Sequence, residues 1–94
     1  MKPSARTRAL LRAWENRNFR KFNQLIKAMS KEQTAEEFRK LRIAEGYSEE
    51  DLAPWVGLTA RTVREWESGR RKRKLPTLYF YSLLGLKLWK PTHR

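Results

Sequence analysis

The sequence predicts an all-α fold, and three observations lead to this expectation. Apolar residues recur at roughly helical spacing over residues 5–29. In the middle of the chain, Thr34 followed by Glu37 and Ser48 followed by Asp51 match the capping-box pattern that begins many helices. β-Strand signal is weak except over residues 78–81, so an all-helical chain is the more economical interpretation. We expect four to five helices in one domain, with an extra basic N-terminal helical segment.

The N-terminal part, residues 1–31, reads as a basic amphipathic helical extension. Ser4 can cap its first helix because its hydroxyl can accept a backbone N–H. The polar run over residues 15–18 interrupts the apolar stripe. The sequence alone therefore leaves open whether this segment is one long helix or two short ones.

The main domain is expected over residues 32–90, and its first two helices have recognisable ends. Thr34 with Glu37 is expected to open a helix that Gly46 ends as a left-handed cap. Ser48 with Asp51 repeats the device. The second helix stops at Gly57, and Pro54 inside it removes one backbone donor, so it should be short or kinked.

Thr59 can cap a third helix that ends at Gly69. A solvated basic loop over residues 70–74 follows, and Pro76 suits the first turn of a final helix. The expected apolar side of that helix is Leu78, Phe80 or Tyr81, Leu83 and Leu84. From Lys87 onward we expect a short tail, with residues 91–94 outside the domain.

Composition limits the classes of function. The chain has no cysteine, which excludes disulfide frameworks, cysteine-ligated zinc and thiol catalysis. No apolar run approaches the ~20 residues needed to span a bilayer. The N-terminus lacks the apolar stretch and cleavage site of a signal peptide. We expect a cytoplasmic protein associated with the nucleoid and not with a membrane.

Charge is unevenly distributed along the chain. The net charge is +12, with nine Lys/Arg and one acid in residues 1–31, and eight Lys/Arg and no acid in residues 70–94. Residues 32–69 carry five basic and nine acidic residues. Two basic segments thus flank a more acidic centre. Such a charge favours polyanions, and nucleic acid is preferred over a merely solvated surface.

The segment over residues 46–69 is the most specific signal in the chain. It carries Leu-Ala-x-x-x-Gly-Leu-Thr from Leu52 and Thr-Val-x-x-Trp-Glu-Ser-Gly from Thr62. With Leu41-Arg42 before it, this pattern resembles the Cro/repressor (Xre-type) helix-turn-helix family over about residues 34–86. The resemblance implies a lambda-repressor-like domain whose second motif helix enters the major groove of double-stranded DNA.

Carried over by position, the resemblance assigns base contacts to the start of that helix. Arg61 and Arg64 are the best readers because a guanidinium can bind guanine O6 and N7 together. The other candidates are Ala60, which can touch a thymine methyl, the hydroxyl of Thr62 and the carboxylate of Glu65. The base-reading set is Ala60, Arg61, Thr62, Arg64 and Glu65. A solvated helix face is the alternative reading of these residues.

Phosphate contacts are expected from the helix starts and from an unusually long basic loop. Pro76 lies seven residues after Gly69, where the family more often has about four. Family members often carry a glutamine at the position of Glu49, where it donates a hydrogen bond to a phosphate. Glu49 cannot make that contact, because an ionised carboxylate only accepts hydrogen bonds. The basic loop can compensate for that loss. The phosphate-contact set is Ser48, Thr59, Arg70, Arg71, Lys72, Arg73 and Lys74.

Two further expectations follow from the resemblance. Arg42 and Glu67 match a pair that stabilises the fold of the family, so we assign them a structural ion pair. Family members commonly form dimers through their last helices, and a homodimer would read two half-sites about one helical turn (~34 Å) apart. The candidate dimer residues are Tyr79, Phe80, Leu83, Leu86 and Trp89. Trp55 is expected in the core, with an exposed partner surface as the alternative.

Residues 6–27 lie outside the family pattern, and three readings compete. They can form a packed extra helix, a helix for a protein partner, or an arm along DNA. The first is favoured because Trp14, Phe19 and Phe22 need burial. A membrane-surface helix fits the charges less well beside a DNA motif.

Almost nothing in the sequence supports catalysis, and we expect no cofactor. The acids in the first helical turns are assigned to the helix dipole, with metal binding as the less favoured alternative; they are Glu36, Glu37, Glu49, Glu50 and Asp51. His93 is the only histidine and lies one residue from the end. The favoured hypothesis is a sequence-specific transcriptional regulator that acts as a repressor or autorepressor. The family resemblance implies a phage, plasmid or toxin–antitoxin setting for it. The alternatives are an antitoxin-type interaction protein that regulates its own operon, and a nonspecific nucleic-acid-binding protein.

Overall fold

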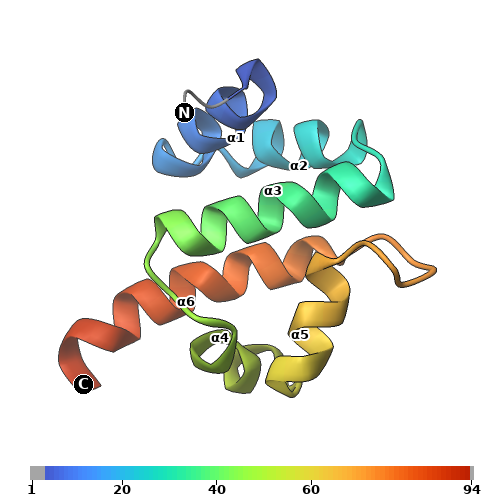
Figure 1. Ribbon diagram of the computed structural model, residues 1–94. Helices are drawn as coiled ribbons and strands as arrows, with labels where there is room; N and C mark the ends of the chain where they lie inside the picture. Colours follow the sequence, from blue (N-terminus) through green and yellow to red (C-terminus); the bar gives the residue numbers. More distant parts are fainter. Residues whose placement is uncertain (1–3, 94) are drawn as a thin grey trace. The chain divides into compact units, whose positions relative to one another are not determined.

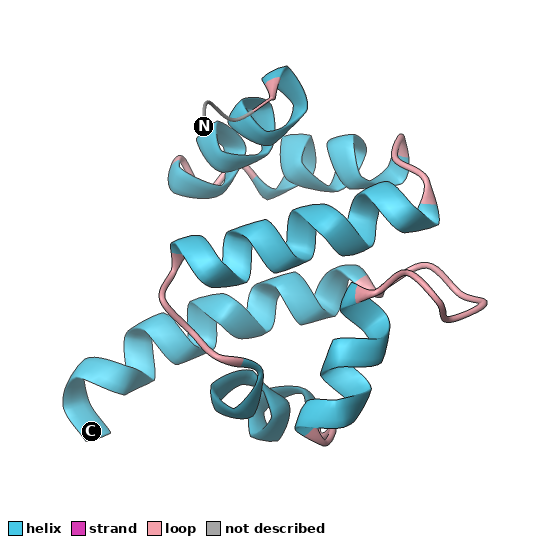
Figure 2. Cartoon of the chain, in the orientation of Figure 1, coloured by secondary structure: helices cyan, strands magenta, loops and turns pink. Residues whose placement is uncertain are grey.

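The computed structural model describes residues 4–93, with side chains placed for residues 4–85. Over these residues the chain forms six α-helices and no strand, which confirms the all-α prediction (Figures 1 and 2). The residues 78–81 that carried some strand signal are helical. The chain divides into two compact units, Met1–Ser30 and Lys31–Arg94.

The first unit contains two helices and not one. α1 spans Ala5–Glu15 and α2 spans Phe19–Lys27. Ser4 caps α1 as expected, since its Oγ accepts the backbone N–H of Thr7 at 3.2 Å. Arg17 interrupts the helical conformation between the two helices, since its φ of 56° is left-handed. The rings of Trp14 and Phe22 then meet across the two helices at a centroid distance of 5.2 Å.

α3, the first helix of the second unit, spans Lys31–Ala44 and corrects one prediction. The capping box expected at Thr34 is wrong, because the helix begins three residues earlier and Thr34 is fully buried inside it. Ser30 and Gln33 offer the same capping spacing just before the observed start. Gly46 follows the helix with a left-handed φ of 83°, as expected of a glycine cap.

α4 spans Glu49–Val56 and begins as predicted. Ser48 Oγ accepts the N–H of Asp51 at 3.1 Å, and an Asp51 carboxylate oxygen accepts the N–H of Ser48 at 3.1 Å. Gly57 ends the helix with a left-handed φ of 70°, after only eight residues that include a proline. A three-residue turn then leads to α5, so the two helices form a helix-turn-helix-like unit.

α5 spans Ala60–Glu67, and Thr59 caps it by accepting the N–H of Thr62 at 3.2 Å. Its buried face carries Val63 and Glu67. The opposite face is exposed. The core of the unit holds this helix in place, since α5 contacts both α3 and α4, and α4 in turn contacts the last helix.

α6 spans Thr77–His93, directly after Pro76. The short tail expected from Lys87 onward is therefore wrong for residues 87–93, which continue the helix. Gly85 does not end it, because an interior glycine costs a helix only about 1 kcal/mol. The start of α6 also differs from expectation, since Leu78 is 69% exposed and does not belong to the apolar side.

The core of the second unit forms where α3, α4, α5 and α6 meet. Phe38 of α3 and Phe80 of α6 pack edge to face, with centroids 5.2 Å apart. Such aromatic pairs add about 0.5–1.5 kcal/mol beyond the burial of their area. The other buried apolar side chains of this unit are Ala35, Leu41, Tyr47, Leu52, Ala53, Val63, Leu75 and Leu83.

Candidate nucleic-acid interface

The exposed face of α5 carries most of the predicted base-reading side chains. Arg61, Arg64 and Glu65 are exposed, while Ala60 and Thr62 are half-buried. The Thr62 hydroxyl lies 3.0 Å from that of Thr59, so it takes part in the cap of the helix. Two arginines and one acid therefore point outward from a helix whose other side is anchored in the core.

Ser48 and Thr59, the two predicted phosphate contacts at helix starts, are both exposed N-cap residues. Each side-chain oxygen accepts a backbone N–H of its own helix. A hydroxyl that accepts one hydrogen bond can still donate its own proton. Ser48 thus keeps a proton that it can donate to a phosphate oxygen, and Thr59 does so when Thr62 is the donor in the hydrogen bond between their hydroxyls.

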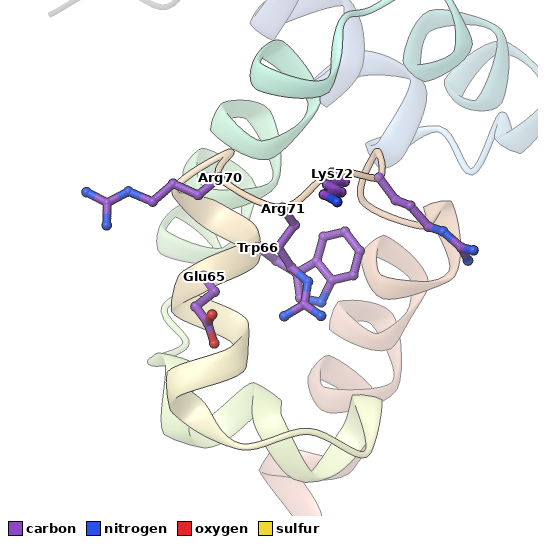
Figure 3. A pocket seen from close by; sticks show the side chains of 6 residues that line it. Glu65, Trp66, Arg70, Arg71 and Lys72 are labelled. Atoms are coloured by element: carbon purple, nitrogen blue, oxygen red, sulfur yellow. The ribbon is translucent and has the colours of Figure 1, made fainter.

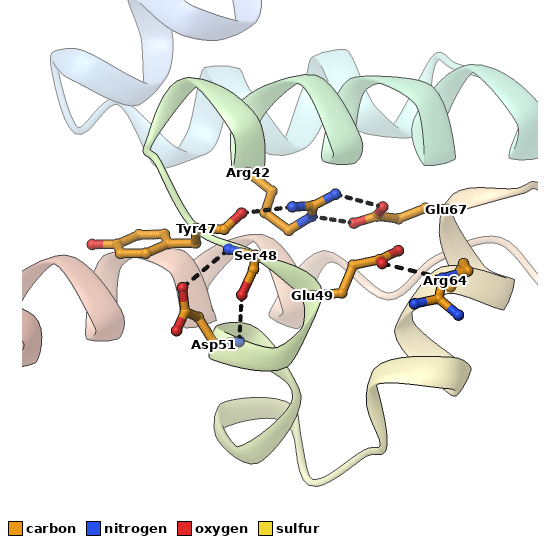
Figure 4. A network of polar contacts seen from close by, with 7 residues as sticks. All are labelled: Arg42, Tyr47, Ser48, Glu49, Asp51, Arg64 and Glu67. Carbon is orange, nitrogen blue, oxygen red and sulfur yellow. Dashed lines mark hydrogen bonds and ion pairs between the residues drawn. The ribbon is translucent and has the colours of Figure 1, made fainter.

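A buried ion pair fixes α5 to α3. Arg42 Nε and Nη2 donate to the two carboxylate oxygens of Glu67 at 2.6 and 3.0 Å, and Nη1 donates to the carbonyl of Tyr47 at 2.6 Å (Figure 4). This is the fold-stabilising pair expected from the sequence. The hydrogen bond with Glu67 raises the pKa of Arg42, while burial acts in the opposite direction. Because Arg42 is buried and its charge is balanced by Glu67, we do not count it among the cations of the surface.

A second ion pair was not predicted from the sequence. Arg64 Nε donates to Glu49 Oε1 at 3.2 Å, which joins the exposed face of α5 to the first turn of α4 (Figure 4). The two residues are 15 positions apart in the chain. Only the angle between two helices brings them together, and residue spacing carries no signal for it. Glu49 thus binds an arginine at the position where a phosphate contact was in doubt.

The basic loop over residues 70–74 is not uniform. Arg70, Lys72 and Arg73 are exposed, whereas Arg71 and Lys74 are half-buried. Burial lowers the pKa of Lys74. The three exposed residues are therefore the ones best placed to meet a polyanion.

Arg71 is held by an aromatic contact. Its guanidinium carbon lies 4.7 Å from the centre of the Trp66 ring, a cation–π arrangement (Figure 3). Tyr79 packs against the same ring in a T-shaped arrangement, with centroids 5.8 Å apart and planes at 88°. An open pocket of about 610 Å³ lies here, between the end of α5 and the loop. It is lined by Glu65, Trp66, Arg70, Arg71, Lys72 and Arg73.

Two of the proposed dimer residues are wrong as surface contacts. Phe80 and Leu83 are 0% and 1% exposed, because they face the core of the second unit and not solvent. Tyr79 is half-buried beside Trp66. The side chains of the remaining two candidates, Leu86 and Trp89, lie outside the described residues.

Trp55 departs from the core role expected for it, since it is 39% exposed. Its ring covers Gly85 of α6. A Cβ built on Gly85 would lie 3.2 Å from two carbon atoms of the indole. The indole thus packs its six-membered ring beside Gly85 of α6 and keeps part of its surface in solvent.

In the N-terminal unit, Trp14 and Phe22 are buried and Phe19 is half-buried, which meets the need for burial that favoured a packed segment.

Within residues 4–93, no helix combines the length and apolar character needed to cross a membrane. Among the side chains with described positions, no group of three or more His, Cys, Asp or Glu residues could hold a metal ion.

Comparison of the chain with protein-family models, with curated proteins and with solved structures gave no significant match.

Proposed function

We propose that this chain is a sequence-specific binder of double-stranded DNA that inserts α5 into the major groove and regulates transcription. The observation that carries the proposal is the exposed face of α5, where Arg61 and Arg64 stand outward from a helix anchored by the Arg42–Glu67 pair. A guanidinium on such a face can donate two hydrogen bonds to one guanine.

The surrounding charge supports the same proposal. Exposed Arg70, Lys72 and Arg73 follow α5 directly in the chain, and cationic side chains beside a groove-reading helix position it on phosphates. Ser48 and Thr59 add hydroxyl groups at the starts of α4 and α5. With this arrangement, base contacts come from the helix and phosphate contacts come from its flanks.

Repression by occluding a promoter is the simplest regulatory mechanism for this arrangement. A homodimer would read a pseudo-palindromic operator with half-sites about 34 Å apart. Its interface would exclude Phe80 and Leu83, which are buried in the core. Sedimentation equilibrium of the free protein tests the dimer. A regulator of this kind would act in the cytoplasm, on the nucleoid.

Selection of binding sites from random duplex DNA tests the function directly. The selected sequence is then titrated against scrambled DNA at ~150 mM salt, and a preference of at least about 10³-fold is expected for a specific regulator. Weak, equal and steeply salt-dependent binding to both DNAs would contradict base readout. In that case a nonspecific nucleic-acid binder or an interaction protein becomes the better assignment.

Arg61→Ala identifies the reading helix. It should relax specificity at one base position by about 1–3 kcal/mol, because it removes a bidentate contact to one guanine. Arg39→Ala is the matched control, since Arg39 is an exposed arginine on α3, outside the motif. An equal loss of affinity on every sequence for both variants would show that Arg61 contributes only charge.

A further inference from the structure

Arg64 is an exposed arginine whose guanidinium is nevertheless held in place. Its side chain is 62% exposed, yet Nε donates to Glu49 Oε1 at 3.2 Å. The partner is not a loose surface acid, since the Glu49 side chain is only 18% exposed. A partly buried carboxylate at the start of α4 thus orients an arginine at the outer face of α5.

The geometry selects which edge of the guanidinium is available. Arginine has five N–H donors in a rigid planar fork. Glu49 accepts from Nε, so the outer edge with Nη1 and Nη2 remains to meet guanine O6 and N7 end-on (Figure 4). This one hydrogen bond restrains the orientation of the fork before DNA arrives, so less freedom is lost on binding.

The charge of Glu49 acts in the same direction. An unpaired exposed arginine binds any phosphate, because that attraction carries no sequence information. A carboxylate beside Arg64 offsets its positive charge and repels phosphate, whereas a guanine edge can still accept from the outer N–H groups. Glu49 also favours the charged form of Arg42, which indicates that it lies near the anchored Arg42–Glu67 pair.

From these observations we infer that Glu49 is a positioning residue for base recognition: it holds Arg64 so that its outer N–H edge reads one guanine and does not bind phosphate. This inference rests on the proposed function. Because Arg64 is largely exposed to solvent, the pair should add little to stability, and we assign its effect to discrimination between DNA sequences.

A double-mutant cycle tests the inference in the full chain, using duplex DNA selected by the wild-type protein. Arg64→Ala first identifies the base pair that Arg64 reads, where preference should fall about tenfold, equivalent to about 1.4 kcal/mol. Glu49→Ala should reduce preference at that same base pair and raise affinity for scrambled DNA. In the Arg64→Ala background, Glu49→Ala should reduce that preference no further.

Glu50→Ala is the matched control. Glu50 is the next acid in the first turn of α4, is exposed, and also acts on Arg42 through its charge. Its loss should raise affinity for all DNA without changing any base preference. Urea unfolding should give closely similar midpoints for both glutamate variants and the wild type, which separates positioning from stability.

Each remaining outcome is decisive. The inference is overturned if Glu49→Ala leaves the base preference intact, if Arg64→Ala changes no base preference, or if the effect of Glu49→Ala persists without Arg64. Failure of the proposed function has a different signature, because the wild-type protein would then select no sequence at all.

Discussion

At the residue scale, the Arg42–Glu67 pair is expected to matter most for stability. Arg42 is 7% exposed and Glu67 is 9% exposed, so removing one partner leaves the other charge buried. Glu67→Ala should lower the free energy of unfolding by about 3 kcal/mol, the lower end for a broken buried pair. Urea unfolding followed by circular dichroism measures this loss.

Glu65→Ala provides the control for that experiment. Glu65 is an exposed acid on the same helix, and its replacement should change the free energy of unfolding by no more than about 0.5 kcal/mol. Equal losses for the two variants would mean that helix charge, and not the ion pair, determines the stability of α5.

Tyr47 links stability to alkaline pH. Burial raises the pKa of its phenol above the ordinary value of 10.0, so above pH 10 the folded chain keeps a proton that the unfolded chain has lost. Since the unfolded state then binds fewer protons, the free energy of unfolding falls as pH rises above 10. Tyr47→Phe should have a shallower decline than the wild type between pH 10 and 11, measured by urea unfolding. Parallel declines would contradict this.

Residue pairs differ in how far the sequence could predict them. Arg42 and Glu67 were paired only because of the resemblance to a known family, since they are 25 positions apart. Glu49 and Arg64 were not paired, because their contact depends on the crossing of α4 and α5. Apolar character predicted a core role for Trp55, yet its position beside Gly85 leaves it partly in solvent.

At the element scale, local chemistry determined most helix ends. The Ser48–Asp51 box, the Thr59 cap and the left-handed Gly57 all act over three or four residues, which is why sequence could predict them. The cap predicted at Thr34 was wrong for a reason that is not local. A threonine at capping spacing can also sit inside a helix when the core buries it, as it does here.

Gly85 and Gly57 should respond in opposite directions to the same substitution. Gly85→Ala should raise the free energy of unfolding by up to about 1 kcal/mol, because alanine favours the helix and the partly exposed Trp55 can move outward by a few tenths of an ångström. Thermal unfolding measures the change. A loss of stability would show that Trp55 cannot move.

Gly57→Ala is the companion variant. A Cβ there meets no atom within 4 Å, but the residue has a φ of 70°. The left-handed backbone alone should lower the free energy of unfolding by about 1–2 kcal/mol. If both alanine variants destabilised equally, contact with Trp55 and not helix propensity would dominate at Gly85.

At the scale of the whole molecule, charge and fold are separable. The net charge of +12 follows from composition and was known from the sequence. The sequence could not predict which cations are exposed, because exposure depends on tertiary structure. Within the basic loop, Arg71 stacks on Trp66 and Lys74 is half-buried, so only Arg70, Lys72 and Arg73 are exposed.

The salt dependence of DNA binding distinguishes a local contact from a general attraction. Replacing Arg70, Lys72 and Arg73 together with glutamine should weaken binding to selected and scrambled DNA alike, because phosphate contacts carry no sequence information. If all three engage phosphates, the slope of log K against log salt should fall by roughly 2.7, at about 0.9 per contact. Titrations between ~50 and ~200 mM salt measure that slope.

The matched control removes the same charge from the N-terminal unit. Arg8, Arg20 and Lys21 are exposed there, and their replacement with glutamine also lowers the net charge by three. If the loop contacts DNA directly, the slope should fall much more for the loop variant than for this control. Equal changes would mean that binding follows net charge and that the loop has no special place at the interface. With the slope unchanged in both variants, phosphate contacts by Arg70, Lys72 and Arg73 would have to be abandoned, and the attraction to DNA assigned to the cations of α5.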